Sequence, residues 1–106
     1  MDKVVDKNLV IDQCLISLAN GNNDAMDSLY VIIKNDIYAY ALSKVRNKFD
    51  ADDIMQDTFL KIYENAKLYK PMGKGLAWIF TIETNVINRY FQIKSIQKRK
   101  RRINRS

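Results

Sequence analysis

The sequence contains no histidine, one cysteine, one proline and three glycines. Histidine is the commonest general acid and base, and no serine or cysteine lies beside a plausible base, so we expect no catalytic activity from the chain itself. The single cysteine, Cys14, cannot form an internal disulfide and has apolar neighbours. It therefore predicts a small core residue in a reducing compartment. The scarcity of glycine and proline favours long helices.

The sequence also lacks any apolar run close to the roughly 20 residues that span a bilayer. Its N-terminus is too acidic and too poor in apolar residues for a signal peptide. Its 106 residues, 47% of them apolar and 28% charged, suit one globular domain with a single modest core. We therefore expect one domain, residues 1–106, located in the cytoplasm.

Negative charge is absent from the last part of the chain. Residues 84–106 carry eight Lys/Arg and no acid, whereas residues 1–83 carry ten Lys/Arg and twelve Asp/Glu. The formal net charge of +6 is therefore a property of one end. A mildly acidic body with a strongly basic end indicates two partners of different charge.

Hydrophobic periodicity predicts four helices, a short one over residues 8–20 and three longer ones over 24–45, 51–66 and 76–100. Gly21 suits a C-terminal cap on the first helix. From residue 94 the apolar stripe thins, so that end is expected to project from the core or to fray. No strand alternation is present, and the expected fold is all-α, with three main helices and a short N-terminal one. The residues expected to face inward are Leu9, Ile11, Cys14, Leu15, Leu18, Met26, Leu29, Tyr30, Ile33, Ile37, Tyr40, Ala41, Val45, Ile54, Met55, Thr58, Phe59, Ile62, Tyr63, Ala66, Leu76, Ile79, Phe80, Val86, Ile87, Tyr90 and Phe91.

The stretch DADDIMQDTF, residues 50–59, holds four of the twelve acids. A calcium loop of the EF-hand type starting at Asp50 needs glycine at its sixth position and glutamate at its twelfth. Met55 and Lys61 stand there instead, so we expect no metal site. Asp50 and Asp52 instead suit a helix start, where carboxylates satisfy free N–H groups and meet the positive end of the helix dipole.

A helix start does not account for Gln56 and Asp57. Together with Asp53 and Lys61 they follow three- and four-residue steps, so these four residues share one face of the predicted helix. That face is either a solvated surface or a surface on which a partner docks.

A family resemblance bears on this choice. The stretch DADDIMQDTFLKIYENA resembles the core-binding segment of region 2 in bacterial RNA polymerase sigma factors, especially the extracytoplasmic-function type, whose pattern is roughly D-A-E-D-[LI]-[VM]-Q-[DE]-x-F-[LI]-[KR]-x-[WY]. Upstream, GNNDAMDSLY resembles G-D-x-x-A-[FM]-x-x-L-Y. Downstream, AWIFTIETNVINRYF resembles A-W-[LI]-x-x-I-A-x-N-x-x-x-[DN]. The resemblance covers about residues 18–102, with its core at 24–102.

The resemblance implies a helical region 2 bundle, no cofactor and two main partners. The first is core RNA polymerase, whose largest subunit presents a clamp-helix coiled coil rich in arginine. Carboxylates and amides on a rigid helix suit charge-assisted contacts to arginine. An anti-sigma factor is a further partner that the resemblance allows. The implied polymerase-binding residues are Asp53, Gln56, Asp57, Leu60 and Lys61.

The basic end, residues 94–105, holds seven cations and no acid. A solubilising tail and an anionic membrane surface are two alternatives, but the segment lacks the bulky apolar face of a membrane-surface helix. Closely spaced cations displace counterions along a phosphate chain, so we favour nucleic acid and expect no membrane partner. The resemblance agrees, because sigma region 2 ends in a basic helix that lies along promoter DNA.

The only clear internal loop is KLYKPMGKG, residues 67–75, which offers Tyr69 and Met72 as apolar surfaces among three lysines. A cationic groove with stackable side chains suits an unpaired strand, whereas a plain turn with a tyrosine covering the core is the alternative. Trp78 is expected in the core. The resemblance implies that this loop and the start of the last helix receive a base flipped out of the non-template strand of the minus-ten element. The candidate DNA-binding residues are Lys67, Tyr69, Lys70, Met72, Lys74, Asn85, Arg89, Gln92, Lys98, Arg99, Lys100, Arg101 and Arg102.

One departure from the pattern concerns the DNA-reading helix. The family often has asparagine followed four residues later by aspartate; Asn85 matches, but Arg89 stands at the second position. Arg89 can read a base edge or bind a phosphate, so the family's promoter preference does not carry over. Nothing in the sequence resembles the second sigma domain, which reads the minus-thirty-five element.

We therefore expect a transcription initiation domain that binds core polymerase and recognises and opens the minus-ten element. Two alternatives belong to other classes. One is a helical module that binds nucleic acid without specificity. The other is a protein-interaction module that titrates polymerase or an anti-sigma factor without touching DNA.

Overall fold

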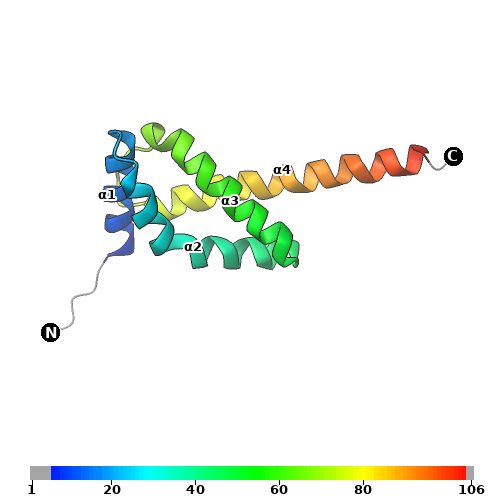
Figure 1. Ribbon diagram of the computed structural model, residues 1–106, viewed down its shortest axis with the longest axis horizontal. Coiled ribbons are helices and arrows are strands. Elements are labelled where there is room, and N and C mark those ends of the chain that lie inside the picture. Colours follow the sequence, from blue (N-terminus) through cyan, green and yellow to red (C-terminus); the bar gives the residue numbers. More distant parts are fainter. Residues whose placement is uncertain (1–5, 105–106) are drawn as a thin grey trace.

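The structure, a computed structural model, describes the backbone of residues 6–104 and the side chains of residues 6–101. The described chain is built of four α-helices, one short 3-10 helix and no strand (Figure 1). The all-α prediction is therefore confirmed. The elements are α1 (Lys7–Ala19), α2 (Asp24–Val45), α3 (Lys48–Asn65), η1 (Ala66–Leu68) and α4 (Gly75–Asn104).

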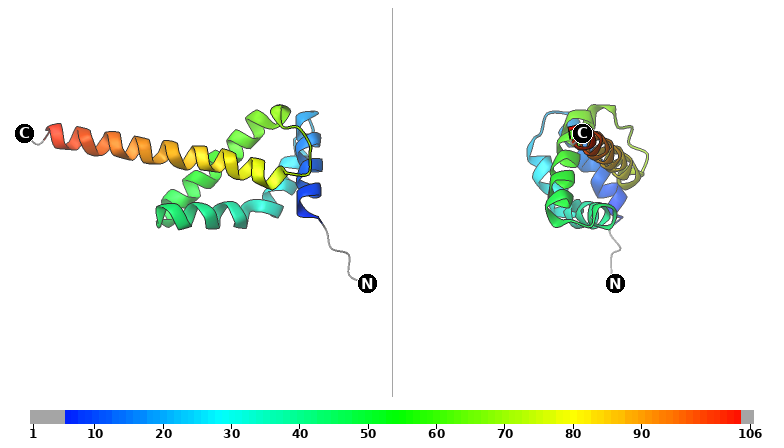
Figure 2. Two further views of the ribbon diagram at one scale, coloured as in Figure 1. Left: turned by 180° about the vertical axis from the view of Figure 1, so that it is seen from behind. Right: turned by 90° about the vertical axis from the view of Figure 1, so that its right-hand side faces the viewer.

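Helices α2, α3 and α4 pack on one another, and α1 lies across one end of this bundle (Figures 1 and 2). The first part of α4 lies in the bundle, and the rest projects beyond it (Figure 2). A helix of 30 residues is about 45 Å long, which is longer than the bundle it packs against. This projection explains the elongated dimensions of 66 × 31 × 22 Å.

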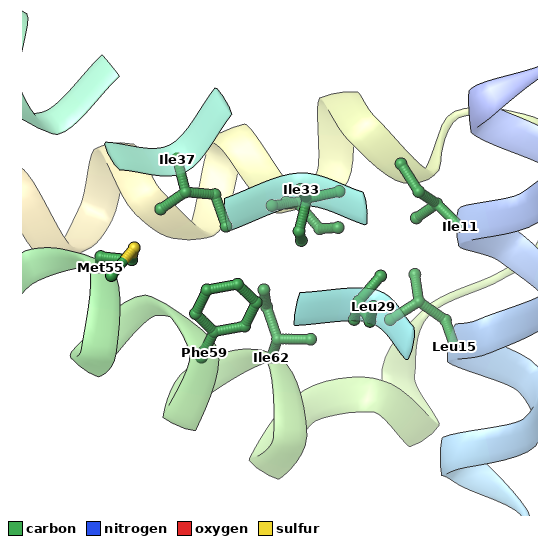
Figure 3. Close-up of a cluster of buried hydrophobic side chains, with 9 residues drawn as sticks. Ile11, Leu15, Leu29, Ile33, Ile37, Met55, Phe59 and Ile62 are labelled. Carbon is green, nitrogen blue, oxygen red and sulfur yellow. The ribbon is translucent and has the colours of Figure 1, made fainter. Parts of the chain in front are cut away.

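The main core cluster draws side chains from all four α-helices (Figure 3). A second cluster lies where α4 leaves the bundle and contains Ala41, Ala51, Ile54, Val86 and Ile87. The main cluster consists of Ile11, Leu15, Leu29, Ile33, Ile37, Met55, Phe59, Ile62 and Ile79.

Four residues predicted to face inward are exposed instead, namely Leu9, Tyr30, Tyr63 and Phe91, with exposed fractions of 42–55%. Residues at three- and four-residue steps form a stripe, and in this small bundle the edges of that stripe extend beyond the surface that neighbouring helices cover. Cys14 is half-buried and packs against the main cluster, and burial raises the pKa of its thiol.

Helix α3 begins three residues earlier than predicted because its N-terminal cap is an asparagine. The side chain of Asn47 accepts hydrogen bonds from the backbone N–H groups of Phe49 (2.9 Å) and Asp50 (3.1 Å). The prediction that Asp50 and Asp52 provide the cap is therefore wrong. Asp50 still lies in the first turn, where its charge is favourable to the helix dipole, and its side chain is available for another partner.

The turn between α1 and α2 confirms the cap predicted at Gly21. This glycine has a φ of 95°, and its N–H donates to the carbonyl of Leu18 at 3.0 Å. A left-handed residue after the last helical turn closes the free carbonyls of a helix at little cost when it is glycine.

Candidate functional site

The outer surface of α3 carries the residues predicted to bind polymerase. Asp53, Gln56 and Lys61 are exposed, Asp57 is half-buried, and Leu60 is 54% exposed. Because α3 is fixed by six buried residues on its opposite face, it presents this surface on a rigid element.

The charged residues of this surface differ in whether they are paired. The ion pairs among the described residues join Lys7 to Asp36 and Lys61 to Glu64. Asp53 and Asp57 therefore have no ion pair within the part of the chain that the structure describes. Unpaired carboxylates beside an exposed leucine leave this surface open to a partner that offers cations and apolar side chains.

Asp50 has a structural partner on another helix. Its carboxylate accepts a hydrogen bond from the hydroxyl of Tyr90 on α4. Burial, followed by this bond and the nearby charges of Asp50 and Asp53, raises the pKa of Tyr90 to about 12. The phenol therefore stays a hydrogen-bond donor at neutral pH, and the pair joins the start of α3 to the region where α4 leaves the bundle.

An open groove of about 490 Å³ runs between α3 and α4 and brings the two predicted sites together. From the predicted polymerase surface it contains Asp57 and Lys61, and from the predicted DNA-binding set it contains Asn85, Arg89 and Gln92. Sequence reasoning missed two other polar groove residues, one on each helix. The signal was helical spacing, because they lie four residues after Lys61 and three after Asn85; they are Asn65 and Asn88.

Arg89 also lines a second, smaller groove, together with Asp53, Asp57, Tyr90 and the exposed Ile93. The arginine therefore lies beside the acidic surface of α3 rather than among the other cations of α4. Arg89 is exposed and has no ion pair among the described residues, so its guanidinium is available to a partner.

The loop between η1 and α4 divides into inward and outward residues. Tyr69 is half-buried, with its ring centroid 5.0 Å from that of Trp78, and both pack against the main core cluster. This placement of Trp78 agrees with its predicted core position. Met72 is 69% exposed. The cations predicted for this region are exposed as well: Lys67, Lys70 and Lys74.

The inward position of Tyr69 depends on a buried acid of α1. Asp12 is 4% exposed, and its carboxylate accepts hydrogen bonds from the hydroxyl of Tyr69 and from the N–H of Gly73 (2.7 Å). Burial, then the bond to Asp12, raises the pKa of Tyr69. The contact favours the interpretation in which this tyrosine covers the core, and DNA binding by Tyr69 stays a prediction. No pattern in the sequence pointed to Asp12, because its partners lie about 60 residues away.

The basic end continues α4 as a helix beyond the bundle (Figure 2). Of the two alternatives predicted for this end, projection from the core and fraying, the structure shows projection. Successive residues are 100° apart around a helix, so its cations point in several directions. The apolar residues Ile93 and Ile96 are exposed among them. The side chains of Arg102 and Arg105 lie outside the described residues. The described cations are all exposed: Lys94, Lys98, Arg99, Lys100 and Arg101.

Sequence reasoning also missed Glu83, which is fully buried on α4. Neither of its carboxylate oxygens has a hydrogen-bond partner among residues 6–101. Burial raises its pKa to about 8. The pattern that residues 77–89 resemble has alanine at this position, so the resemblance gave no reason to expect a carboxyl group there.

Two further observations concern metal ions and membrane-spanning helices. Within residues 6–101, no group of three or more His, Cys, Asp or Glu side chains could hold a metal ion. No helix in the described part is long and apolar enough to cross a membrane.

The Sigma-70 region 2 family model matches residues 29–101, and the chain belongs to this family. Among curated proteins, the ECF RNA polymerase sigma factor SigM of Bacillus subtilis is 31% identical over 65 residues, which cover 61% of this chain and 39% of that protein. SigW of the same organism is 27% identical over 78 residues, covering 74% and 42%. The RNA polymerase sigma factor CarQ of Myxococcus xanthus is 29% identical over 66 residues, covering 62% and 38%.

The chain therefore spans about two fifths of the length of these relatives. No solved structure gave a significant match. The matched residues include all of α3 and the loop, whereas α1 lies ahead of them.

Proposed function

We propose that the chain is the region 2 domain of a sigma factor, in which residues 24–102 bind core RNA polymerase and recognise and open the minus-ten element of a promoter. Family membership supports this role. One structural observation carries it: Asp53 and Asp57, which lie beside the exposed Leu60 on the rigid face of α3, have no ion pair with any residue that the structure describes.

Polymerase docking on this face is supported by its mixed chemistry. An arginine-rich coiled coil offers cations to the two carboxylates and apolar side-chain stems to Leu60, and Gln56 adds an amide. Gln56 donates to Asp52 at 2.8 Å, which orders its side chain along α3. A face that is ordered before binding loses less entropy on docking. An anti-sigma factor that competes with polymerase would use the same surface.

DNA binding is supported by the exposed cations of the loop and of projecting α4. The loop presents Lys70 and Lys74 on either side of the exposed Met72, which suits an unpaired strand with one base against an apolar side chain. The cations of residues 94–101 lie along about two turns of exposed helix and suit phosphates without regard to sequence. The non-template strand would then contact the loop, and the adjacent duplex would contact α4.

The docking test reverses Asp53 and Asp57 to lysine together. The affinity for purified core polymerase should fall by a factor on the order of 100, because two charge pairs become two repulsions. The matched control reverses two other exposed acids, Asp24 and Asp27 in the first turn of α2, which changes the net charge equally. Circular dichroism checks that both variants stay helical. Equal affinity in the two variants would show that the α3 face does not dock.

The two alternatives predict different outcomes. A non-specific nucleic-acid module binds DNA but not core polymerase. A titrating module binds polymerase but leaves a promoter bubble untouched. Binding of the chain–polymerase complex to a bubble with a preferred minus-ten strand, compared with a scrambled one, separates both from the proposed function.

A further inference from the structure

Helix α1 makes three polar contacts with the loop and the start of α4. The carboxylate of Asp12 accepts from the hydroxyl of Tyr69 and from the N–H of Gly73 at 2.7 Å. One turn earlier, the side-chain oxygen of Asn8 accepts from the backbone N–H of Leu76 at 2.9 Å. Asn8 and Asp12 are four residues apart and share one face of α1. A single helix therefore contacts both the loop and the first turn of α4.

The backbone on the loop side is shaped to allow these contacts. Gly73 has a φ of 74°, a left-handed conformation that other residues rarely adopt. Gly75 lies so close to α1 that a Cβ there would be 2.5 Å from Ile11 Cγ2 and 2.7 Å from Asp12 Oδ1. The loop therefore returns to α4 through one glycine that its left-handed backbone favours and a second, Gly75, that the close approach to α1 requires.

These contacts divide the loop into fixed and presented residues. Tyr69 and Gly73 are held by the same buried carboxylate, and the residues between them, 70–72, are all exposed. With both ends of this short segment fixed on one group, its conformation is restricted before any partner arrives. One buried side chain thus accepts both bonds, one on each of its carboxylate oxygens.

We propose that Asp12 is a positioning residue for recognition of the unpaired DNA strand. Its hydrogen bonds to Tyr69 and Gly73 restrict the segment between them. The side chain of Met72 is thereby held outward for contact with a base, and that of Lys70 for contact with its phosphate. Tyr69 then acts through its hydroxyl on the loop, not as a surface on which a base stacks. The inference rests on the proposed function, and it assigns part of strand recognition to a helix ahead of the residues that match the family.

The test uses Tyr69→Phe and Asp12→Asn, separately and combined. Phenylalanine keeps the ring against Trp78 and removes only the hydroxyl; asparagine keeps the volume of Asp12 and removes its charge. Asp12→Asn replaces one of the two accepting oxygens, and Tyr69→Phe removes the bond that holds the carboxylate in place. Each single variant should therefore increase amide exchange at Gly73 by about tenfold, while core amides of α2 keep their rates. The exchange rate at Gly73 in the double variant should be close to that in either single variant, since both substitutions break the same Tyr69–Asp12–Gly73 hydrogen-bond network.

The second measurement is strand preference in the complex with core polymerase, as the ratio of affinities for preferred and scrambled minus-ten bubbles. Tyr69→Phe and Asp12→Asn should both reduce this ratio by about tenfold, with polymerase affinity and salt dependence unchanged. Gln13→Ala, an exposed neighbour on α1, is the matched control and should leave the ratio as it is.

The outcomes separate this inference from the proposed function. If Met72→Ala abolishes strand preference while Tyr69→Phe and Asp12→Asn leave it intact, the positioning role is overturned and the proposed function stands. If the unmodified protein shows no strand preference, the proposed function fails, and the positioning role fails with it. Should Asp12→Asn not fold, Tyr69→Phe alone decides, because its ring packing is retained.

Discussion

The hydroxyl of Tyr90, on α4, donates a hydrogen bond to the carboxylate of Asp50, in the first turn of α3. One acid of the DADDIMQDTF stretch thus serves the fold, whereas Asp53 and Asp57, on the same helix, have no ion pair among the described residues. Three of its four acids therefore separate into one structural acid and two acids available to a partner, and the fourth, Asp52, accepts a hydrogen bond from Gln56.

This separation predicts opposite phenotypes for two similar substitutions. Asp50→Asn or Tyr90→Phe should lower the free energy of unfolding by about 1 kcal/mol, the net contribution of one hydrogen bond, and leave polymerase affinity unchanged. Asp57→Asn should leave stability unchanged and weaken polymerase binding. Chemical denaturation and a binding titration measure the two effects. A loss of polymerase affinity in Tyr90→Phe without a loss of stability would contradict this assignment.

Glu83 predicts an unusual pH dependence of stability. Its pKa rises from 4.5 to about 8 in the folded protein, so between these values the folded state holds a proton that the unfolded state has released. Stability from this group is therefore full below pH 4.5 and decreases as the pH rises toward 8. The slope is about 1.4 kcal/mol per pH unit at most.

The measurement is urea unfolding of the unmodified protein and of Glu83→Gln across this pH range. The variant should lack the decrease, so the difference in unfolding free energy should grow from pH 5 to pH 8 and then level off. Glu64→Gln, at an exposed position, is the control and should run parallel to the unmodified protein. Parallel curves for Glu83→Gln would show that the carboxyl group finds a partner or water in solution.

The loop and the basic end should affect DNA binding differently. Replacing Lys98, Arg99, Lys100 and Arg101 by glutamine should weaken binding to all strands about equally. For each phosphate that is no longer neutralised, the slope of log affinity against log salt should decrease by roughly 0.7 to 0.9. Met72→Ala should instead cost about 1–3 kcal/mol on the preferred strand if a base stacks there, with little change in salt slope.

The assay is the same pair of promoter bubbles bound by the complex with core polymerase at several salt concentrations. Loss of strand preference on neutralising the basic end, with preference intact in Met72→Ala, would reverse the roles assigned to the two elements. No effect of either change on DNA binding would favour the titrating module.

The close approach of α4 to α1 predicts a difference between two glycines. Gly75→Ala should destabilise the protein by about 1–3 kcal/mol, because the new methyl group overlaps Ile11 and Asp12. Gly21→Ala meets no atom within 4 Å and should cost only about 1 kcal/mol, through its left-handed backbone. Thermal or urea unfolding measures both. Strand preference should fall in Gly75→Ala and persist in Gly21→Ala; equal effects would show that α1 and α4 adjust to one another.

The sequence by itself determined the helical class, the approximate helix ranges and the family. Hydrophobic periodicity along a helix depends on near neighbours, so it places Leu29, Ile33 and Ile37 in the core without knowledge of the fold. The spacing of Asp53, Gln56 and Asp57 likewise placed these residues on one face. Local backbone geometry is the physical reason, since residues three and four apart on a helix must lie side by side.

Only the tertiary structure decided which polar groups have partners. Asp12 meets Tyr69 and Gly73 across 57 and 61 residues of chain, and Asp50 meets Tyr90 across 40. Glu83 has no partner within the described part of the chain, although it follows the same helix pattern as its neighbours. Such pairings depend on how helices are brought together in space, and periodicity within one helix carries no information about the side chains of another. Packing of α1 across the end of the bundle is what makes Asp12 a buried acceptor for the loop.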